Sequence, residues 1–186
     1  SYLMADPRFN RALAKRRGNI LCEPVKAWHS KDIMQVAGLV SNEYSQAAPG
    51  DKPAMIAVDA IGLGAGVADR LRELGLPVRA VNVSESPSVE DRYIRQRDEL
   101  WWKVREWFQA RDCRIPEDDD LMAELTGPSY TFTSAGKIKV ESKDDMKRRG
   151  VASPDKADAF CLTFALGNVG KAAYRKPLQQ DYRWVV

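Results

Sequence analysis

Four aspartates stand where carboxylates could act together on bound cations. Asp6 and Asp59 each follow a short apolar run, and Asp155 and Asp158 lie three residues apart late in the chain. Carboxylate oxygens, with no histidine among them, are the ligands that Mg²⁺ and Mn²⁺ prefer. Two such ions about 4 Å apart can activate a water molecule and stabilise the leaving oxygen of a phosphodiester. The pattern therefore indicates metal-assisted hydrolysis of a phosphodiester.

The rest of the composition excludes other common kinds of site. One histidine, His29, is too few for a His-rich metal centre, and three widely spaced cysteines form neither a disulfide framework nor a zinc motif. A chain of 186 residues with 44% hydrophobic residues has the size and core of one domain. Its net charge of +3 permits a nucleic-acid partner without requiring one. No apolar run is long enough to span a membrane.

The first part of the chain predicts three short strands in an antiparallel meander. They fall at residues 2–5, 13–18 and 19–28. Asp6, followed by Pro7, then stands at the end of the first strand. A helix capped by Ser30 is expected to follow and to run to about Tyr44.

The middle of the chain predicts a strand–helix–strand unit. Residues 54–58 are apolar without a break, which is typical of a strand buried on both faces, and Asp59 ends it. A helix over 67–74 and a strand over 77–83 predict a parallel pair with a right-handed crossover. The intervening glycines do not match the G-x-G-x-x-G spacing of a dinucleotide site, and no acidic residue ends the next strand.

The second half predicts helices around a hairpin. The expected elements are a long helix over 88–111, a strand over 112–116, a helix over 119–125 behind the solvated acidic run 117–120, a hairpin of 130–133 with 137–140, and a short helix after Ser142. Arg97 lies on the apolar stripe of the long helix, where a charge must be paired or face a ligand. The last helix, capped by Ser153 and running to about Leu166, turns Asp158 towards the core.

Each acid also has a simpler interpretation. Asp6 could start a turn, Asp59 could cap the next helix, and Asp155 could favour the dipole of the last helix. Only the joint order of the acids raises the metal-site hypothesis above these structural roles.

Several stretches resemble the C-terminal nuclease domain of the large terminase subunit of tailed bacteriophages. They are residues 55–59 with 62–71, 97–101, 141–147 and 153–159. The resemblance implies an RNase H-like α/β fold, with a central mixed sheet of an antiparallel meander and parallel strands, flanking helices and an added β-hairpin. This domain is expected over 1–170, followed by a basic tail over 171–186.

The resemblance also implies an endodeoxyribonuclease that uses two Mg²⁺ or Mn²⁺ ions to cut concatemeric double-stranded viral DNA during packaging. Its metal-binding acids map to Asp6, Asp59 and Asp155, with Asp158 as a ligand or a close neighbour. In that family a Gly and further acids often follow the first Asp, whereas Pro7 and Arg8 follow it here. The partners it implies are the terminase ATPase domain, the small terminase subunit and the portal, on a procapsid in the host cytoplasm.

Basic residues near the last helix predict the contact with DNA. They are Lys143, Lys147, Arg148 and Arg149, with Arg97 on the long helix. Three alternatives stay open: another RNase H-like nuclease such as a junction resolvase or hybrid nuclease, a non-catalytic module that docks a motor onto DNA or a portal, and a nucleotide-binding α/β domain.

Overall fold

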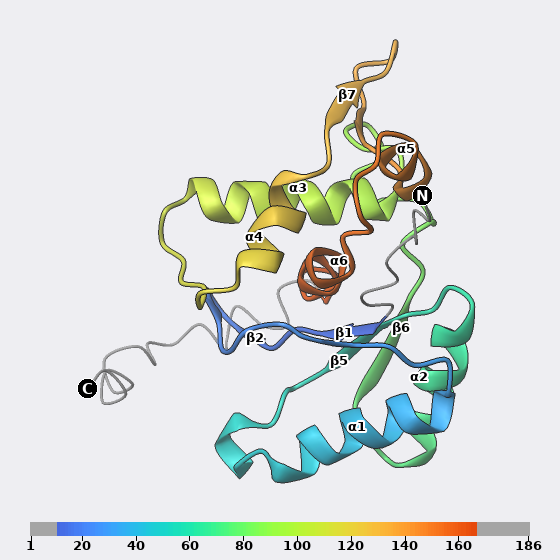
Figure 1. Ribbon diagram of the computed structural model, residues 1–186, viewed down its shortest axis with the longest axis vertical. Coiled ribbons are helices and arrows are strands. Elements are labelled where there is room, and N and C mark those ends of the chain that lie inside the picture. Colours follow the sequence, from blue (N-terminus) through green and yellow to red (C-terminus); the bar gives the residue numbers. More distant parts are fainter. Residues whose placement is uncertain (1–10, 167–186) are drawn as a thin grey trace, which may run out of the picture.

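The computed structural model describes residues 11–166, in which short strands lie between two groups of helices (Figure 1). On one side are α1 (Ile33–Gln46), a 3-10 turn η1 (Pro49–Asp51) and α2 (Leu63–Glu73). On the other are α3 (Gln96–Gln109), α4 (Asp119–Thr126), α5 (Lys143–Arg148) and α6 (Asp155–Leu162). Asp6, the strand predicted before it and the tail over 171–186 lie outside the described residues. No helix within 11–166 is long and apolar enough to cross a membrane.

The predicted strand–helix–strand unit is present. Strands β5 (Ile56–Asp59) and β6 (Val78–Val81) pair in parallel, with α2 as the connection between them. The register places Asp59 opposite Val81. Asp59 is thus the last residue of its strand, as the apolar run before it predicts.

The antiparallel part is shorter and more broken than predicted. Strand β1 (Arg11–Leu13) pairs with β4 (Lys26–Trp28), and β2 (Arg16–Arg17) pairs with β3 (Ile20–Leu21). The backbone reverses next to Gly18, whose φ of 54° suits glycine. These strands form one interrupted hairpin, and every sheet within 11–166 has two strands. The mixture of parallel and antiparallel strands between helices confirms the predicted α/β class.

The glycine-rich turn after β5 serves close packing. A Cβ at Gly64 would lie 1.7 Å from the carbonyl oxygen of Asp59, and one at Gly66 would lie 2.8 Å from Cδ1 of Ile33. These glycines let α2 begin at Leu63, four residues before the predicted start, with its first turn directly against the end of β5. The turn therefore fixes where the Asp59 backbone lies.

Helix α6 lies at the centre of the domain. It contacts β1, β4 and β5 on one side and α3 and α4 on the other. Its Ala157 and Phe160 are fully buried in the main core cluster, with Leu100 of α3 and Leu121 of α4. A second cluster, around Leu71, joins α1 and α2 to the opposite face of the strands. Burial on both sides fixes the direction in which α6 presents its first turn.

Helix α3 begins at Gln96, not near residue 88 as predicted. The reason is two buried carboxylates in its first turn: Glu99 accepts hydrogen bonds from the backbone N–H and hydroxyl of Ser88, and Asp98 accepts from the N–H of Arg95 and of Val140. These bonds hold the preceding segment as a loop folded against the helix.

The remaining predicted elements are present with one exception. Strands β7 (Tyr130–Phe132) and β8 (Ile138–Val140) form the expected hairpin, and the hydroxyl of Ser142 caps α5 by accepting from the N–H of Asp145. The strand predicted over 112–116 is reduced to a single bridge between Arg114 and Ile20.

The glycine packing yields the first prediction. We expect Gly64→Ala to lower the free energy of unfolding by about 1–3 kcal/mol, because the new methyl group must push α2 away from β5. Gly38→Ala is the control: Gly38 is inside α1 with open space around its Cβ position, and this change should stabilise by about 0.5–1 kcal/mol. Urea unfolding of both variants measures this, and equal stability of the two would contradict the packing role.

Candidate active site

A cleft of about 690 Å³ opens where the C-terminal end of β5 meets α3, α5 and α6. Three of the four predicted acids line it: Asp59 from the strand end, and Asp155 and Asp158 from the first turn of α6. Lys143 and Arg97 line the same cleft. The structure thus brings into one place residues that are up to 99 positions apart in the sequence (158 − 59).

Lys143 lies between two of these carboxylates. Its Nζ is 2.8 Å from Oδ2 of Asp158 and 3.4 Å from Oδ1 of Asp155. Desolvation lowers the pKa of Lys143, but the charges of Asp158 and Asp155 more than offset this, so the net shift of its pKa is upward. A single cation can therefore be shared by the two aspartates of α6.

Asp158 is held from the side of α3. The indole Nε1–H of Trp101 donates to its Oδ1 at 2.9 Å, and Nε of Arg97 is 3.5 Å from the same oxygen. The Asp158 side chain is 24% exposed, so it faces the cleft wall rather than bulk water. Its partners are two side chains of another helix and one lysine, which explains how a carboxylate is accommodated beside the core.

Asp155 is oriented by its own neighbour in the sequence. The hydroxyl of Ser153 donates to Oδ1 of Asp155 at 2.7 Å. Ser153 was predicted to cap the last helix with its hydroxyl, but Pro154 stands at the cap position and α6 ends at Leu162, before the predicted end. The serine hydroxyl binds a site carboxylate in place of the helix backbone.

Asp59 is exposed to the cleft, and its carboxylate accepts the N–H of Ile61 at 3.1 Å. Desolvation by the cleft walls raises its pKa; the Ile61 hydrogen bond and Lys143 lower it, Asp158 raises it, and the net direction is upward. Desolvation therefore disfavours the ionised form of Asp59, and a cation bound in the cleft would favour it.

Within residues 11–166, no group of three acidic, histidine or cysteine side chains is close enough together to hold a metal ion. The fourth predicted ligand, Asp6, lies outside this range. The donors that are present still suit a divalent cation, because two carboxylates already share the Lys143 ammonium and Asp59 faces the same space. The chemistry of these oxygen donors therefore suits such an ion, and Lys143 supplies positive charge between Asp155 and Asp158.

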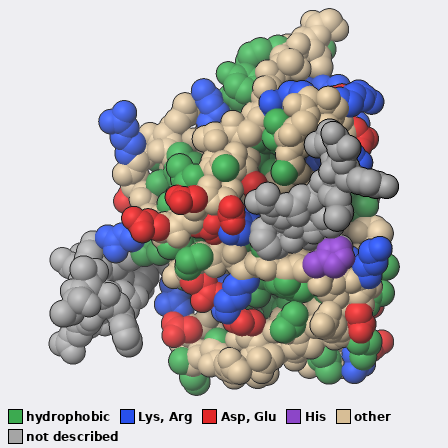
Figure 2. Space-filling model, in the orientation of Figure 1, with side chains coloured by type: hydrophobic (Ala, Val, Ile, Leu, Met, Phe, Trp, Pro, Cys, Tyr) green, Lys and Arg blue, Asp and Glu red, His purple; other side chains and the backbone are tan. Residues whose placement is uncertain are grey.

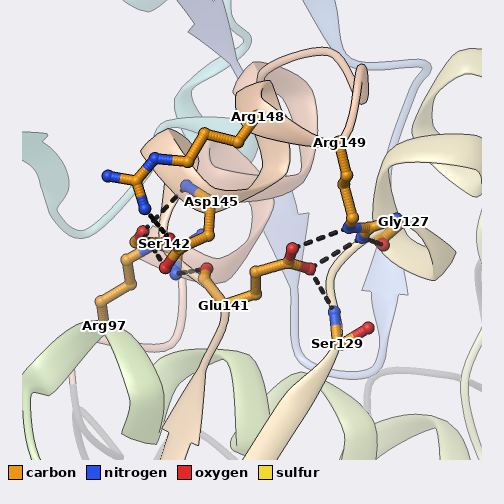
Figure 3. A network of polar contacts seen from close by, with 8 residues as sticks. All are labelled: Arg97, Gly127, Ser129, Glu141, Ser142, Asp145, Arg148 and Arg149. Atoms are coloured by element: carbon orange, nitrogen blue, oxygen red, sulfur yellow. Dashed lines mark hydrogen bonds and ion pairs between the residues drawn. The ribbon is translucent and has the colours of Figure 1, made fainter.

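The basic residues predicted to contact DNA differ in their surroundings. Figure 2 shows Lys and Arg side chains gathered near the hairpin and α5. Arg149 makes a two-pronged ion pair with Glu141, with both N–O distances at 2.7 Å (Figure 3). These bonds, with the N–H of Ser129, lower the pKa of Glu141 to about 2. Arg149 thus ties α5 to the end of β8.

The other basic residues divide between the cleft and the surface. Arg148 pairs with Asp145 at 2.6 Å, and Nη1 of Arg97 donates to the carbonyl of Glu141 at 2.9 Å (Figure 3). Lys147 is exposed on α5 and makes no ion pair with any other residue of the described range. Lys147 is therefore the member of this set best placed to meet an external anion.

Two acidic residues that sequence reasoning missed support α6 from α4. Glu124 accepts the N–H of Ala157 at 2.9 Å, and Asp118 pairs with Lys156 at 2.8 Å while its side chain is only 4% exposed. The acidic run 117–120 was predicted to be solvated, which is wrong for Asp118. Its partner lies 38 residues away, beyond the reach of any local pattern.

Glu124 yields a prediction about pH. Burial raises its pKa to about 7, with a contribution from the charge of Asp155. Because the folded-state pKa exceeds the ordinary value of 4.5, the stabilisation from this group is complete below about pH 4.5 and is lost as pH rises through about 7. We expect Glu124→Gln, which keeps the acceptor for Ala157, to flatten the fall in stability over that window.

Urea unfolding across this pH range measures the effect. Glu117→Gln, at an exposed neighbouring position, should keep the wild-type profile. If the Glu124→Gln profile also stays parallel to the wild-type profile, Glu124 does not titrate as described.

The chain matches no known family model and no curated protein. Solved structures do match. The nuclease domain of the large terminase subunit gp2 of bacterial virus Sf6, in a point mutant with manganese and beta-thujaplicinol, aligns over 85% of this chain and 83% of that one, with a TM-score of 0.67 and 21% identity.

A second group of matches comes from another phage. The large terminase nuclease of thermophilic phage G20c, with bound cobalt, aligns over 85% of this chain and 84% of that one, with a TM-score of 0.55 and 15% identity. Other structures of these two nucleases carry calcium or magnesium. The resemblance found in the sequence is confirmed at the level of the fold: this chain has the RNase H-like fold of phage large-terminase nuclease domains.

Proposed function

We propose that this domain is a metal-dependent endonuclease that cuts concatemeric double-stranded DNA for a viral packaging terminase. The observation that carries the proposal is the cleft that Asp59, Asp155 and Asp158 line together, with a lysine ammonium shared between the last two. The fold favours this assignment over a dinucleotide-binding domain, because the glycine-rich turn is filled by packing against β5.

Mg²⁺ or Mn²⁺ suits the oxygen-only donor set. Asp155 and Asp158 would hold the ions from α6, with Asp59 from β5 and Asp6 as the proposed fourth ligand. Bound as a pair, such ions activate water and stabilise the leaving oxygen of a phosphodiester. In this proposal Lys143 neutralises the carboxylates before the ions bind, while Ser153 and the N–H of Ile61 orient Asp155 and Asp59.

The basic surface beside the cleft would hold the DNA backbone. Lys147 and Arg148 are exposed on α5, next to the helix that carries the acids. Contacts with phosphates position a duplex without reading its sequence, which suits a nuclease of low sequence preference. We extend the proposal to the packaging motor on the procapsid in the host cytoplasm, with the ATPase domain, small subunit and portal as partners.

The metal proposal predicts that DNA cleavage depends on divalent ions and on the Asp59 carboxylate. Plasmid cutting should require Mn²⁺ or Mg²⁺ and stop in excess EDTA, and Asp59→Asn should reduce it to background. In the absence of metal, Asp59→Asn should melt at no lower a temperature than the wild type. The reason is that folding raises the pKa of Asp59 and so already disfavours its ionised form.

Agarose-gel cleavage and thermal melts measure both effects. Asp119→Asn is the control, since Asp119 is exposed at the start of α4 and does not line the cleft. Undiminished cutting in EDTA would contradict metal dependence, and wild-type activity in Asp59→Asn would remove Asp59 from the site. No cutting by the wild type under any condition would favour the docking-module alternative, and a preference for branched or hybrid substrates would favour the other nucleases.

The basic surface predicts a salt dependence. Lys147→Ala with Arg148→Ala should weaken binding to unrelated duplexes by similar factors and flatten the plot of log affinity against log salt by roughly one unit for each lost contact. Lys52→Ala removes a charge that packs on Tyr44 of α1, in the helix group on the other side of the strands from α5, and should leave the slope unchanged. Fluorescence anisotropy at several salt concentrations measures the slopes. Equal slopes for all three proteins would show that α5 does not contact phosphates.

A further inference from the structure

We infer that Trp101 on α3 is a positioning residue for Asp158: its indole N–H holds one carboxylate oxygen so that the other would be available to a metal ion bound in the cleft. The inference rests on the proposed function, since it concerns how a metal-binding carboxylate is oriented. Trp101 would act on the site through Asp158 and would not contact the reacting atoms.

The two oxygens of Asp158 have different partners. Oδ1 accepts the indole N–H of Trp101 at 2.9 Å, whereas Oδ2 is 2.8 Å from the ammonium of Lys143. The first partner can only donate, from a fixed point on a rigid ring. The second is the cation that already occupies the cleft side of the carboxylate. Helix α3 therefore holds Oδ1 and leaves Oδ2 turned towards positive charge.

The indole is itself held in place. Trp101 is 8% exposed and belongs to the main core cluster, together with Leu100 and Val104 of the same helix. A ring fixed in this way cannot follow a carboxylate that rotates, so rotation of Asp158 about its side-chain bonds would break the hydrogen bond. The bond to a charged acceptor is also stronger than one between neutral groups.

Hydrogen bonding of an indole is not obligatory in this core. Among residues 11–166, the buried indole nitrogens of Trp28 and Trp107 have no hydrogen-bond partner. The fold thus tolerates unpaired indole N–H groups in two places, yet it directs the N–H of Trp101 at a carboxylate of the cleft. This contrast argues that the contact serves Asp158 more than it serves the tryptophan.

Arg97 adds positive charge beside the same oxygen, without a hydrogen bond from its Nε. It precedes Trp101 by four residues, on the same face of α3, and its Nε is 3.5 Å from Oδ1 of Asp158. Its Nη1 is anchored on the carbonyl of Glu141 at 2.9 Å, which ties it to the end of β8. Both α3 side chains therefore approach the same oxygen. Loss of such outer contacts typically weakens metal binding by about 10–100-fold.

The test compares two neighbouring tryptophans. Trp101→Phe removes the N–H while keeping an aromatic ring, and Trp102→Phe makes the same change at an equally buried residue that packs on Tyr130 and away from Asp158. Isothermal titration calorimetry with Mn²⁺, on the protein without DNA, should show about 10–100-fold weaker binding for Trp101→Phe. Trp102→Phe should bind as the wild type does, and thermal melts of the metal-free proteins control for folding.

A second measurement follows the metal titration in the wild type, so this part does not depend on how the tryptophan variants fold. In ¹H–¹⁵N spectra, addition of Mg²⁺ should shift the indole N–H signal of Trp101 more than those of the other described tryptophans. Asp158→Asn should shift the same signal without metal. An unmoved Trp101 signal, or Trp101→Phe that binds Mn²⁺ as the wild type does, would overturn the inference while leaving the proposed function standing.

Two further outcomes also decide the matter. Equal weakening in both tryptophan variants would show that the core, and not the N–H, supports the site, and would overturn the inference. A wild type that binds neither Mn²⁺ nor Mg²⁺ would overturn the proposed function and the inference with it.

Discussion

The shared ion pair of Lys143 with Asp155 and Asp158 is the interaction on which the site depends. Carboxylates gathered at the edge of a core are costly unless a positive charge stands between them. Here that charge is an ammonium that reaches both aspartates of α6, and Asp59 lines the same cleft. A divalent ion at the same point would supply the positive charge that Lys143 supplies to Asp155 and Asp158.

The rest of the domain keeps these groups from relaxing apart. Helix α6 is buried on both sides, and its first turn is held from α4 by the hydrogen bond of Glu124 and the buried pair of Asp118 with Lys156. Gly64 lets α2 sit directly on the end of β5, which sets the position of the Asp59 backbone. Moving Asp59 away from the aspartates of α6 would therefore require breaking contacts in the core.

Local patterns explain why part of this could be predicted from the sequence. The unbroken apolar run before Asp59 identifies a buried strand and its end, and the apolar neighbours of Asp158 on its helix turn it inward. Both depend on residues within a few positions. The hydrogen bond from Trp101 to Asp158 joins positions 57 apart, and the pair of Asp118 with Lys156 joins positions 38 apart, so neither appears in any local period. The early start predicted for α3 failed for the same reason, since Glu99 is turned back onto Ser88.

We propose that the cleft carboxylates bind divalent ions in place of the Lys143 ammonium. Crystals soaked in Mn²⁺, with data collected for anomalous scattering, test this most directly. We expect anomalous peaks within about 2.0–2.6 Å of oxygens of Asp155 or Asp158, on the side of the cleft lined by Asp59, with the Lys143 ammonium moved away from Asp158. Peaks only elsewhere, with every one of these carboxylates more than about 6 Å from any ion, would contradict it, since direct oxygen ligation is far shorter than that.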